Sequence, residues 1–428
     1  MKKNQNYRML AVILSLTVVF AGKTGYAQTF SVLYNFGGVS GDPTFPEGPL
    51  TQGSDGALYG TSNSGGASTI HGSVFKLNTA GKVQVLYSFC AQSGCPDGSS
   101  PNAGLTLRPN GHFLGAAANG GVSNDGTLFD ITESGNFTVL YSFMGGTDGK
   151  EPTTPPILGP DGNFYGTARI GGTASPCGTA YRLTPASTGT SAVFTLLHRF
   201  AQSTDGCNPS SLVLGTDGNF YGTTSFGGAA GFGTFFRLTR NGSVRALHTY
   251  TGSSDGVTPS SVTQGSDGNF YVTSHGSITA PGIILKITPT GTWTVLHTTN
   301  QAEGDLGPGL FQASDGNFYG AAESGGTSTN SKCFMGNGCG TLCQVTPAGD
   351  FTVLYDFDFT TGFEPLSGPF QHTSGLLYGN TASGGSFGGG VLYSLNNSLL
   401  AYAALIPTQA KVGTPVEVLG KGSRHPPA

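Results

Sequence analysis

The sequence predicts an all-β protein, a seven-bladed β-propeller of four-stranded antiparallel blades. Three observations lead to this prediction: a hexapeptide that occurs seven times, four short β-strand patterns in each repeat, and complementary strand fragments at the two ends of the repeats. The hexapeptide Asp-Gly-Asn-Phe-Tyr-Gly is complete from residues 161, 217 and 315, and degenerate copies begin at residues 55, 110, 267 and 374. Their spacing of 48 to 59 residues is typical of a propeller or a solenoid.

The fourth repeat shows the strand pattern most clearly. Its four predicted strands cover residues 210–216, 219–224, 234–239 and 243–250. Asp217 and Gly218 join the first two strands, and we expect a tight type I′ hairpin there because Asp-Gly suits two turn residues with positive φ. Arg240, Asn241 and Gly242 join the last two strands in another hairpin. Four antiparallel strands in a repeat of this length make one propeller blade.

The two ends of the repeat region predict how the ring closes. Residues 29–36 have the pattern of a fourth strand without the three strands that should precede it, and residues 390–395 have that of a third strand without a fourth. We expect the N-terminal strand to complete the last blade, so that residues 28–395 form a closed ring with no long unpaired edge. An open Gly/aromatic solenoid is the alternative, but it would not need complementary ends.

Composition and charge narrow the class of protein. Glycine supplies 71 of 428 residues and charged residues only 10%. The glycines recur at fixed positions beside aromatic residues, so they indicate turns in an ordered chain rather than low complexity. The formal charge is −4 and there is no Lys/Arg cluster. These features argue against nucleic acid and anionic membranes as partners.

Residues 1–27 have the pattern of a secretory signal peptide. Three positive residues occur within the first eight, an apolar stretch covers residues 9–22, and residues 25–27 form a small-x-small cleavage pattern. An uncleaved anchor is the alternative, but about 14 apolar residues are short for a span of ~20. We therefore expect a secreted or cell-surface protein whose mature chain is not inserted in a membrane.

Residues 396–428 do not continue the repeats. Residues 406–408 and 411–420 resemble the opening strands of an immunoglobulin-like TIG domain. Such a domain needs about 100 residues. The segment is thus expected to be either a truncated domain or a loose appendage, and no function is assigned to it.

The repeat vocabulary resembles a known family. The blocks DGNFYG, GG…GT-aromatic-[KR]-L and VLYSF resemble the secreted bacterial tandem-repeat proteins called GloVer-containing, which carry varied C-terminal anchors. The resemblance covers residues 29–395 and implies a propeller fold and export, but no activity. The fifth repeat departs from the pattern, because Val272 replaces the glycine and residues 274–276 lack the Gly-Gly pair.

Candidate binding residues lie in the variable loops. The tight hairpins fall on one face of the ring, and the longer loops, from second to third strand and from blade to blade, fall on the other. Variable loops on a rigid scaffold are where binding usually occurs. His71 and His275 lie in such loops and are weak candidates for binding. We find no Ser-His-Asp pattern, no His pair at metal-ligand spacing and no phosphate loop, so we expect no catalytic residue, metal site or cofactor.

The repeated polar and aromatic residues are interpreted as structural. We expect the Asp residues of the hexapeptide to form turns. We expect the same of the Asp residues in four Asp-Gly-x-x-Pro loops, which begin at residues 97, 148, 205 and 255. Calcium was the alternative for the loops, but one carboxylate per loop cannot supply six ligands. The Phe-Tyr pairs are expected to pack between blades. His198, His248 and His297 replace a tyrosine of the outer strand found as Tyr34, Tyr87, Tyr141 and Tyr355.

Seven cysteines in an exported chain predict disulfides. The expected pairs are Cys90–Cys95, Cys177–Cys207 and Cys333–Cys339. Cys343 replaces a third-strand aromatic residue and is expected to be a free buried thiol, although a Cys339–Cys343 pair stays open.

These features favour an exported, monomeric binding or interaction scaffold, for carbohydrate or a cell-surface protein, over an enzyme. A polysaccharide-acting or lyase-like propeller enzyme and a purely structural repeat protein are the alternatives. Unlike polar residues that converge at one central funnel would favour the enzyme, and seven similar shallow pockets would favour binding.

Overall fold

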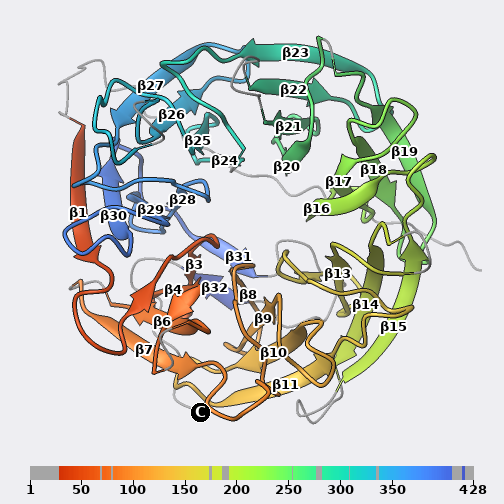
Figure 1. Cartoon of the computed structure of the whole chain (residues 1–428). Helices are drawn as coiled ribbons and strands as arrows, with labels where there is room; N and C mark the ends of the chain where they lie inside the picture. The colour runs from red at the N-terminus through yellow and green to blue at the C-terminus, as the bar shows by residue number, and fades with distance from the viewer. Residues whose placement is uncertain are drawn as a thin grey trace, which may run out of the picture.

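The computed structural model of the chain is a closed ring of seven four-stranded antiparallel sheets (Figure 1). It describes residues 28–406 and 417–419, except 68–69, 79–80, 173–175, 186–191, 253, 276–281, 308 and 334–336. The predicted seven-bladed propeller is confirmed. The predicted signal peptide lies outside the described residues. Within these residues, no helix is long and apolar enough to cross a bilayer.

Each blade runs from an inner strand at the central opening to an outer strand on the circumference (Figure 1). Blades 1 to 3 consist of β3 (Thr51–Gln52), β4 (Leu58–Ser62), β6 (Ser73–Leu77) and β7 (Val83–Ser88); β8 (Leu105–Leu107), β9 (Phe113–Ala117), β10 (Thr127–Ile131) and β11 (Phe137–Ser142); β12 (Ile157–Leu158), β13 (Phe164–Ala168), β14 (Thr179–Pro185) and β15 (Ala192–Arg199).

Blades 4 to 6 continue the same order. They consist of β16 (Cys207–Leu214), β17 (Phe220–Phe226), β18 (Thr234–Leu238) and β19 (Val244–Thr249); β20 (Pro259–Gln264), β21 (Phe270–Ser274), β22 (Ile283–Ile287) and β23 (Trp293–Thr298); β24 (Leu310–Gln312), β25 (Phe318–Ala322), β26 (Thr341–Val345) and β27 (Phe351–Asp356).

Blade 7 joins the two ends of the ring. Its strands are β28 (Phe370–Gln371), β29 (Leu377–Thr381), β30 (Val391–Asn396) and the N-terminal β1 (Thr29–Asn35). β1 pairs with β30 in antiparallel register, from Thr29 opposite Asn396 to Asn35 opposite Val391. The Phe30 ring stacks on Tyr355 of blade 6 at 3.7 Å between centroids. The predicted closure by the N-terminal strand is therefore present.

The hexapeptide turn differs from the predicted type I′ hairpin. Gly218 has a φ of +78°, but Asp217 is not among the residues with positive φ. The Gly218 amide donates to the Gly215 carbonyl at 2.9 Å, and the Gly215 amide donates to the Asn219 carbonyl at 2.8 Å. This is a type I turn followed by a left-handed glycine, the three-residue hairpin loop. Asp217 accepts hydrogen bonds from the Asn219 amide and the Tyr221 hydroxyl, so it is a turn residue as expected.

The last hexapeptide glycine leaves room for an aromatic ring. In blade 2, Gly115 of β9 lies opposite Phe129 of β10, and a Cβ on this glycine would overlap the ring and lie 2.9 Å from Leu105 Cδ2. The same pairing recurs as Gly60–Phe75, Gly166–Tyr181, Gly222–Phe236 and Gly379–Tyr393. In blade 5, Val272 lies opposite Leu285. The departure at Val272 is thus matched by a smaller partner.

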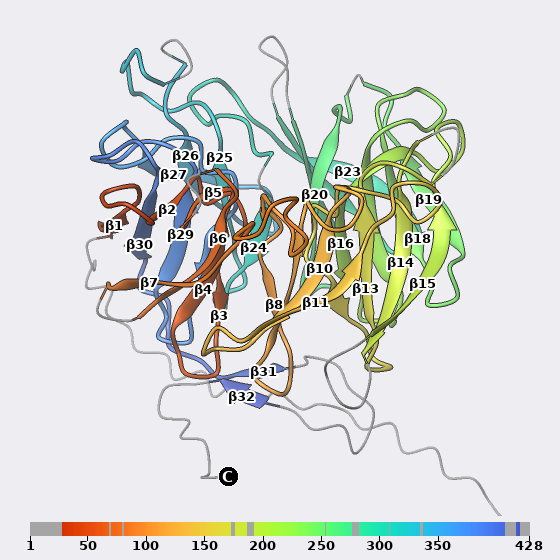
Figure 2. The same ribbon diagram turned by 60° about the horizontal axis from the view of Figure 1, so that its bottom comes forward.

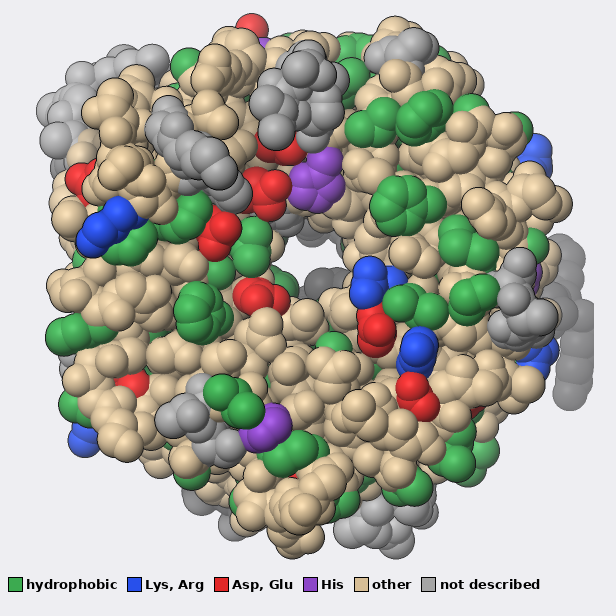
Figure 3. Space-filling model, in the orientation of Figure 1, with side chains coloured by type: hydrophobic (Ala, Val, Ile, Leu, Met, Phe, Trp, Pro, Cys, Tyr) green, Lys and Arg blue, Asp and Glu red, His purple; other side chains and the backbone are tan. Residues whose placement is uncertain are grey.

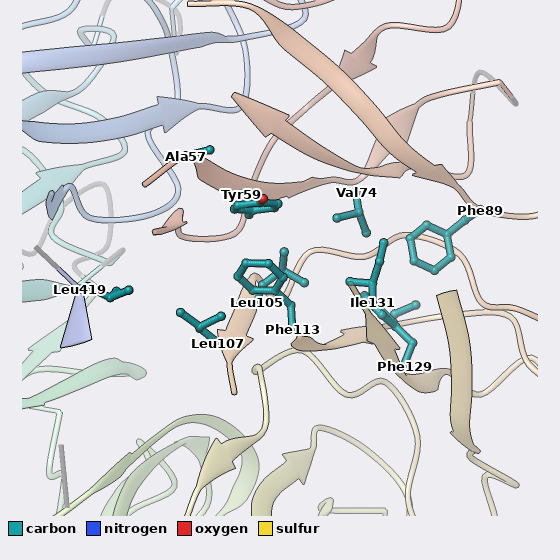
Figure 4. Packing of buried hydrophobic residues seen from close by; sticks show 11 residues of the cluster. Ala57, Tyr59, Val74, Phe89, Leu105, Leu107, Phe113, Phe129, Ile131 and Leu419 are labelled. Carbon is teal, nitrogen blue, oxygen red and sulfur yellow. The ribbon is translucent and has the colours of Figure 1, made fainter. Parts of the chain in front are cut away.

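The Phe-Tyr pairs pack between neighbouring blades, as predicted. Tyr59 of blade 1 lies against Phe113 of blade 2 at 4.3 Å between ring centroids (Figure 4). The same contact recurs at 4.0–4.2 Å in Tyr165–Phe220, Tyr221–Phe270 and Tyr271–Phe318. At four of the seven junctions, one blade therefore contributes an aromatic face to the next, which spreads the apolar core around the ring.

The described part of the tail packs on the ring. β31 (Ala404–Ile406) pairs with β32 (Glu417–Leu419) beneath the face of the short turns (Figure 2). Leu419 is 5% exposed and belongs to a cluster with Ala57 and Leu107 of blades 1 and 2 (Figure 4). The Tyr402 hydroxyl donates to the Gln371 carbonyl at 2.8 Å. In these residues the tail is docked rather than loose.

The cysteines pair as expected. Disulfides join Cys90 to Cys95, Cys177 to Cys207 and Cys333 to Cys339. Cys343 is free and fully buried, and burial raises the pKa of its thiol to about 12. The Cys339–Cys343 alternative is therefore excluded.

Candidate functional site

The long loops surround the mouth of the central opening on the face away from the tail (Figure 2). Two backbone positions of a blade meet there. One is the residue that follows the second strand, and the other lies in the preceding blade-to-blade loop. The amide of the first donates to the carbonyl of the second at 2.8–3.5 Å. We call these mouth pairs: Asn63–Phe45, Ala118–Ser100, Arg169–Glu151, His275–Thr258, Glu323–Asp305 and Ala382–Glu364.

The mouth pairs have similar backbones but different side chains. Phe45, Ser100, Glu151, Thr258 and Glu364 all have φ between 44° and 57°. Their side chains are aromatic, hydroxyl or acidic, and those of their partners are amide, methyl, basic or imidazole. The scaffold thus holds positions that differ chemically from blade to blade around one opening.

His275 lies in the strongest cluster of polar side chains at this mouth. Its Nδ1 is 3.5 Å from Asp305 Oδ2 and 3.7 Å from Glu323 Oε1. The three side chains are 34%, 18% and 28% exposed, so they are held by the fold yet accessible to solvent. Figure 3 looks onto this face, where acidic and histidine side chains gather along the upper rim of the opening.

The charged groups of the cluster shift the pKa values of His275 and Glu323. Burial lowers the pKa of His275, but Asp305 and Glu323 outweigh burial and hold this pKa above its ordinary value. Burial raises the pKa of Glu323, the negative charges of Asp305 and Glu364 raise it further, and His275 opposes them. The quadrant between blades 5 and 7 is therefore rich in negative charge.

Sequence reasoning identified His275 but missed Asp305 and Glu323. Two signals could have found them. Glu323 follows the Phe-Tyr-Gly strand of blade 6 at the position that His275 occupies in blade 5. Residues 303–308 are one residue longer than the Asp-Gly-x-x-Pro loop and contain an extra acid. Aligning the repeats by strand would have placed all three at one mouth.

His71 is not brought to this cluster. Its Nδ1 lies 3.9 Å from Cys95 Sγ, beside the Cys90–Cys95 disulfide. Because both sulfur atoms are in the disulfide, they are not thiolate ligands. The His71 carbonyl accepts from the Ser100 amide at 2.9 Å, which supports the neighbouring mouth pair.

The remaining repeated acids fasten the loops to the outer strands. The Asp97 carboxylate accepts from the Tyr87 hydroxyl at 2.8 Å and from the Cys90 amide. His248 Nε2 lies 3.1 Å from Asp255 in the same arrangement. The pattern recurs in Tyr34–Asp42, Tyr141–Asp148, His198–Asp205 and His297–Glu303. The three histidines therefore occupy the tyrosine position, and the sequence analysis had not identified these acids as their partners.

Exposed apolar side chains concentrate in the loops of the same face. Among the described residues, eight of the eleven exposed large apolar side chains lie there: Val39, Phe45, Ile70, Val122, Met144, Phe226, Phe232 and Phe387. The long-loop face thus carries most of the large apolar side chains that are exposed among the described residues.

A hollow of about 480 Å³ lies on the opposite, short-turn face. Its wall includes Asp55 and Lys76, which form an ion pair. Asp55 belongs to the hexapeptide turn repeated around the ring, whereas the mouth residues differ between blades. The mouth is therefore the better candidate site.

Two solved structures of similar shape are extracellular domains of bacterial proteins. The extracellular domain of a protein described as a hybrid two component system, BT4673 of B. thetaiotaomicron, matches 89% of this chain with a TM-score of 0.56 and 12% identity. That of BT3049 matches 87% with a TM-score of 0.53 and 11% identity. This chain spans 40% and 42% of those two structures. At this identity the likeness shows the fold alone. No curated protein matches the sequence.

The model of one protein family covers most of the repeat region. It matches residues 17–157 and 152–336, which together are more than half of the 428 residues. The chain belongs to the Gloeobacter/Verrucomicrobia repeat family.

Proposed function

We propose that this protein is an exported binding scaffold that holds a carbohydrate ligand at the mouth of the propeller. The observation that carries the proposal is the chemical variety of the mouth pairs. All six pairs share the same backbone hydrogen bond, but their side chains range from Arg169 to Glu323. A scaffold that is constant elsewhere and varied at one opening is suited to recognition.

The long-loop face that bears the mouth pairs suits a sugar. Phe45, Phe226, Phe232 and Phe387 are 40–61% exposed and offer flat apolar faces to the C–H face of a sugar ring. Asn63, Glu151 and Glu364 offer amide and carboxylate groups to its hydroxyls. Glu364 already accepts from the Ser383 hydroxyl at 3.1 Å, so its orientation is set before a ligand arrives. A cell-surface protein is the other ligand that this surface would suit.

Export is part of the proposal. Disulfides persist in oxidising compartments, and three are present among the described residues. Together with the signal pattern of residues 1–27, they favour a secreted or cell-surface protein. We expect a monomer, because a closed propeller leaves only the short outer edges of its blades for a second copy to extend.

A glycan and polysaccharide array tests the binding proposal. The protein should be used from residue 28 to 428, because the tail packs on the ring. Saturable binding to one polysaccharide class is expected, and Phe226→Ala with Phe232→Ala should weaken it roughly tenfold through lost ring contacts. Val193→Ala, which removes an apolar side chain that is 65% exposed on the outer strand β15, should leave the affinity unchanged. Absence of binding to any glycan would turn the search to protein partners.

A polysaccharide-acting enzyme is the second candidate. The observation that favours it is the convergence of His275, Asp305 and Glu323 in one quadrant of the mouth. An imidazole beside carboxylates can serve general acid–base chemistry. Incubation of the bound polymer should then release new chain ends, and Glu323→Gln should abolish this release while the array signal remains. Unchanged polymer length would exclude the enzyme and leave the scaffold.

A further inference from the structure

We propose that His275, Asp305 and Glu323 bind a divalent transition-metal ion, Zn²⁺ in the first instance, at the mouth of the propeller. The site goes beyond the proposed function, because it would exist whichever ligand the scaffold holds. The sequence analysis expected no metal, since 30 residues separate His275 from Asp305 and 18 separate Asp305 from Glu323. Only the ring brings them together.

The separations fit the edges of a metal coordination sphere. The ligand atoms of the three side chains all lie within 4.8 Å of one another, and Nδ1 of His275 is 3.5 and 3.7 Å from the two oxygens. Zn²⁺ takes imidazole nitrogen and carboxylate oxygen at about 2.1 Å, so two tetrahedral ligands lie about 3.4 Å apart. Small side-chain rotations would bring these atoms to that geometry.

The other histidine–acid contacts of the chain differ from this cluster. Charge-assisted hydrogen bonds measure about 2.7–2.9 Å. His112–Asp130 measures 2.7 Å and His297–Glu303 measures 3.0 Å, and each histidine there contacts one acid. His275 instead faces two acids, each beyond the usual length of such a bond. The ion pairs of His275 are thus longer and shared between two acids, whereas the others are short and join one histidine to one acid.

The charge of the quadrant also favours a cation. Asp305 and Glu323 face one imidazole, and Glu364 lies near enough to add its negative field to that of Asp305 at Glu323. Three carboxylates outnumber one histidine even when its ring is protonated. A divalent ion would offset the excess negative charge.

The backbone holds the ligands in place before an ion arrives. The Glu323 amide donates to the Asp305 carbonyl at 3.1 Å, which fixes these two ligands relative to each other. His275 directly follows β21, and its ring lies where a Cβ on Gly307 would be. Because residue 307 is a glycine, there is room for the imidazole at this position.

Three protein ligands leave a coordination position open. Zinc sites with three protein ligands keep a water or a ligand atom in the fourth position. Because the three side chains are partly exposed at the mouth, that position would be accessible to an oxygen atom of a bound molecule. Imidazole with carboxylate suits Zn²⁺ and similar ions, whereas Ca²⁺ prefers oxygen ligands alone.

Titration calorimetry of tag-free, EDTA-treated protein (residues 28–428) with ZnCl₂ tests the site. We expect one ion per chain and a higher melting temperature in Zn²⁺. Loss of an outer hydrogen-bond partner typically costs about 10–100-fold in metal affinity. Loss of a direct ligand in His275→Gln or Glu323→Gln should therefore cost at least about 100-fold. Ca²⁺ should bind more weakly than Zn²⁺.

His198→Tyr is the matched control, because it removes a histidine beside an acid but restores the tyrosine of other blades. Its Zn²⁺ affinity should equal that of the unchanged protein, and circular dichroism should show that all variants are folded. Failure of the unchanged protein to bind Zn²⁺ saturably would overturn the proposal. So would an unchanged Zn²⁺ affinity in both ligand variants, a loss in the control as large as theirs, or tighter binding of Ca²⁺ than of Zn²⁺.

Discussion

At the scale of the residue, this fold depends on matched sizes between adjacent strands. Gly115 makes room for Phe129, whereas Val272 faces Leu285. The third member of each set is the inner-strand residue, Leu105 in blade 2 and Val262 in blade 5. The three side chains thus differ between the two blades, but a larger residue at one position is matched by smaller residues at the others, as close-packed interiors require.

Giving blade 2 the residue types of blade 5 at these three positions tests whether the side-chain volumes must match. Gly115→Val alone should cost about 2–3 kcal/mol in the free energy of unfolding, because the new methyl groups overlap the ring of Phe129. Adding Phe129→Leu and Leu105→Val recreates the blade 5 set and should recover most of the loss. Urea unfolding of the single and triple variants measures both effects. A triple variant less stable than the single one would contradict this matching of volumes.

The turn aspartates give the fold an acid-sensitive component. Burial raises the pKa of Asp267, but hydrogen bonds from Asn269 and the ion pair with Lys286 outweigh it and lower this pKa to about 2. The folded value lies below the unfolded value of about 3.9, so the stability it contributes is present above pH ~4 and is lost as pH falls through about 2.

Asp267→Asn should therefore destabilise the protein by about 1 kcal/mol at pH 6. The difference from the unchanged protein should shrink toward zero near pH 2. Urea unfolding at the two pH values measures it, and an equal loss at both would show that the carboxylate charge is not responsible.

At the scale of the element, local signals predicted strands and cross-links better than turns. Asp-Gly is common both to the type I′ hairpin and to the three-residue loop with a left-handed glycine. Only the bonds from Gly218 to Gly215 and from Gly215 to Asn219 distinguish them. The disulfides could be predicted, because two of the pairs lie within one loop and the third joins two loops of one face.

The disulfides should contribute unequally to stability. Cys177–Cys207 closes a loop of sequence separation 30 and Cys90–Cys95 one of separation 5. The entropy of the unfolded chain then gives about 3.5 kcal/mol for the first and about 2 kcal/mol for the second. Urea unfolding of the two double alanine variants should show this order. Equal losses would mean that native contacts, rather than unfolded-chain entropy, decide the effect.

At the scale of the whole molecule, the ring was predictable, whereas the candidate site was predicted only as a loop face that contains His275. Seven similar repeats predict the blades, because the pattern of each strand lies within one repeat. The complementary strand fragments at the two ends predict that the ring is closed. His275, Asp305 and Glu323 belong to two blades and the loop between them, so no local pattern joins them. Their proximity follows from how the blades are arranged around the opening.

Removing the closing strand tests the ring as a unit. Deletion of residues 28–36 would leave β30 with an unpaired edge and strip Phe30 from Tyr355. We expect aggregation on size-exclusion chromatography. A synthetic peptide of residues 28–36 should restore the monomer, and the same peptide with Phe30→Ala should do so less well. A deletion variant that stays monomeric and fully stable would show that closure is dispensable.

The pairing of β1 with β30 sets an order of events in the life of the chain. Thr29 is synthesised near the beginning, yet its partner Asn396 is added 367 residues later. Until then the first strand has no native neighbour in its own blade, and contacts of such long sequence separation form slowly. The earlier blades can assemble during synthesis, but the ring closes only after β30 has been made and β1 can pair with it.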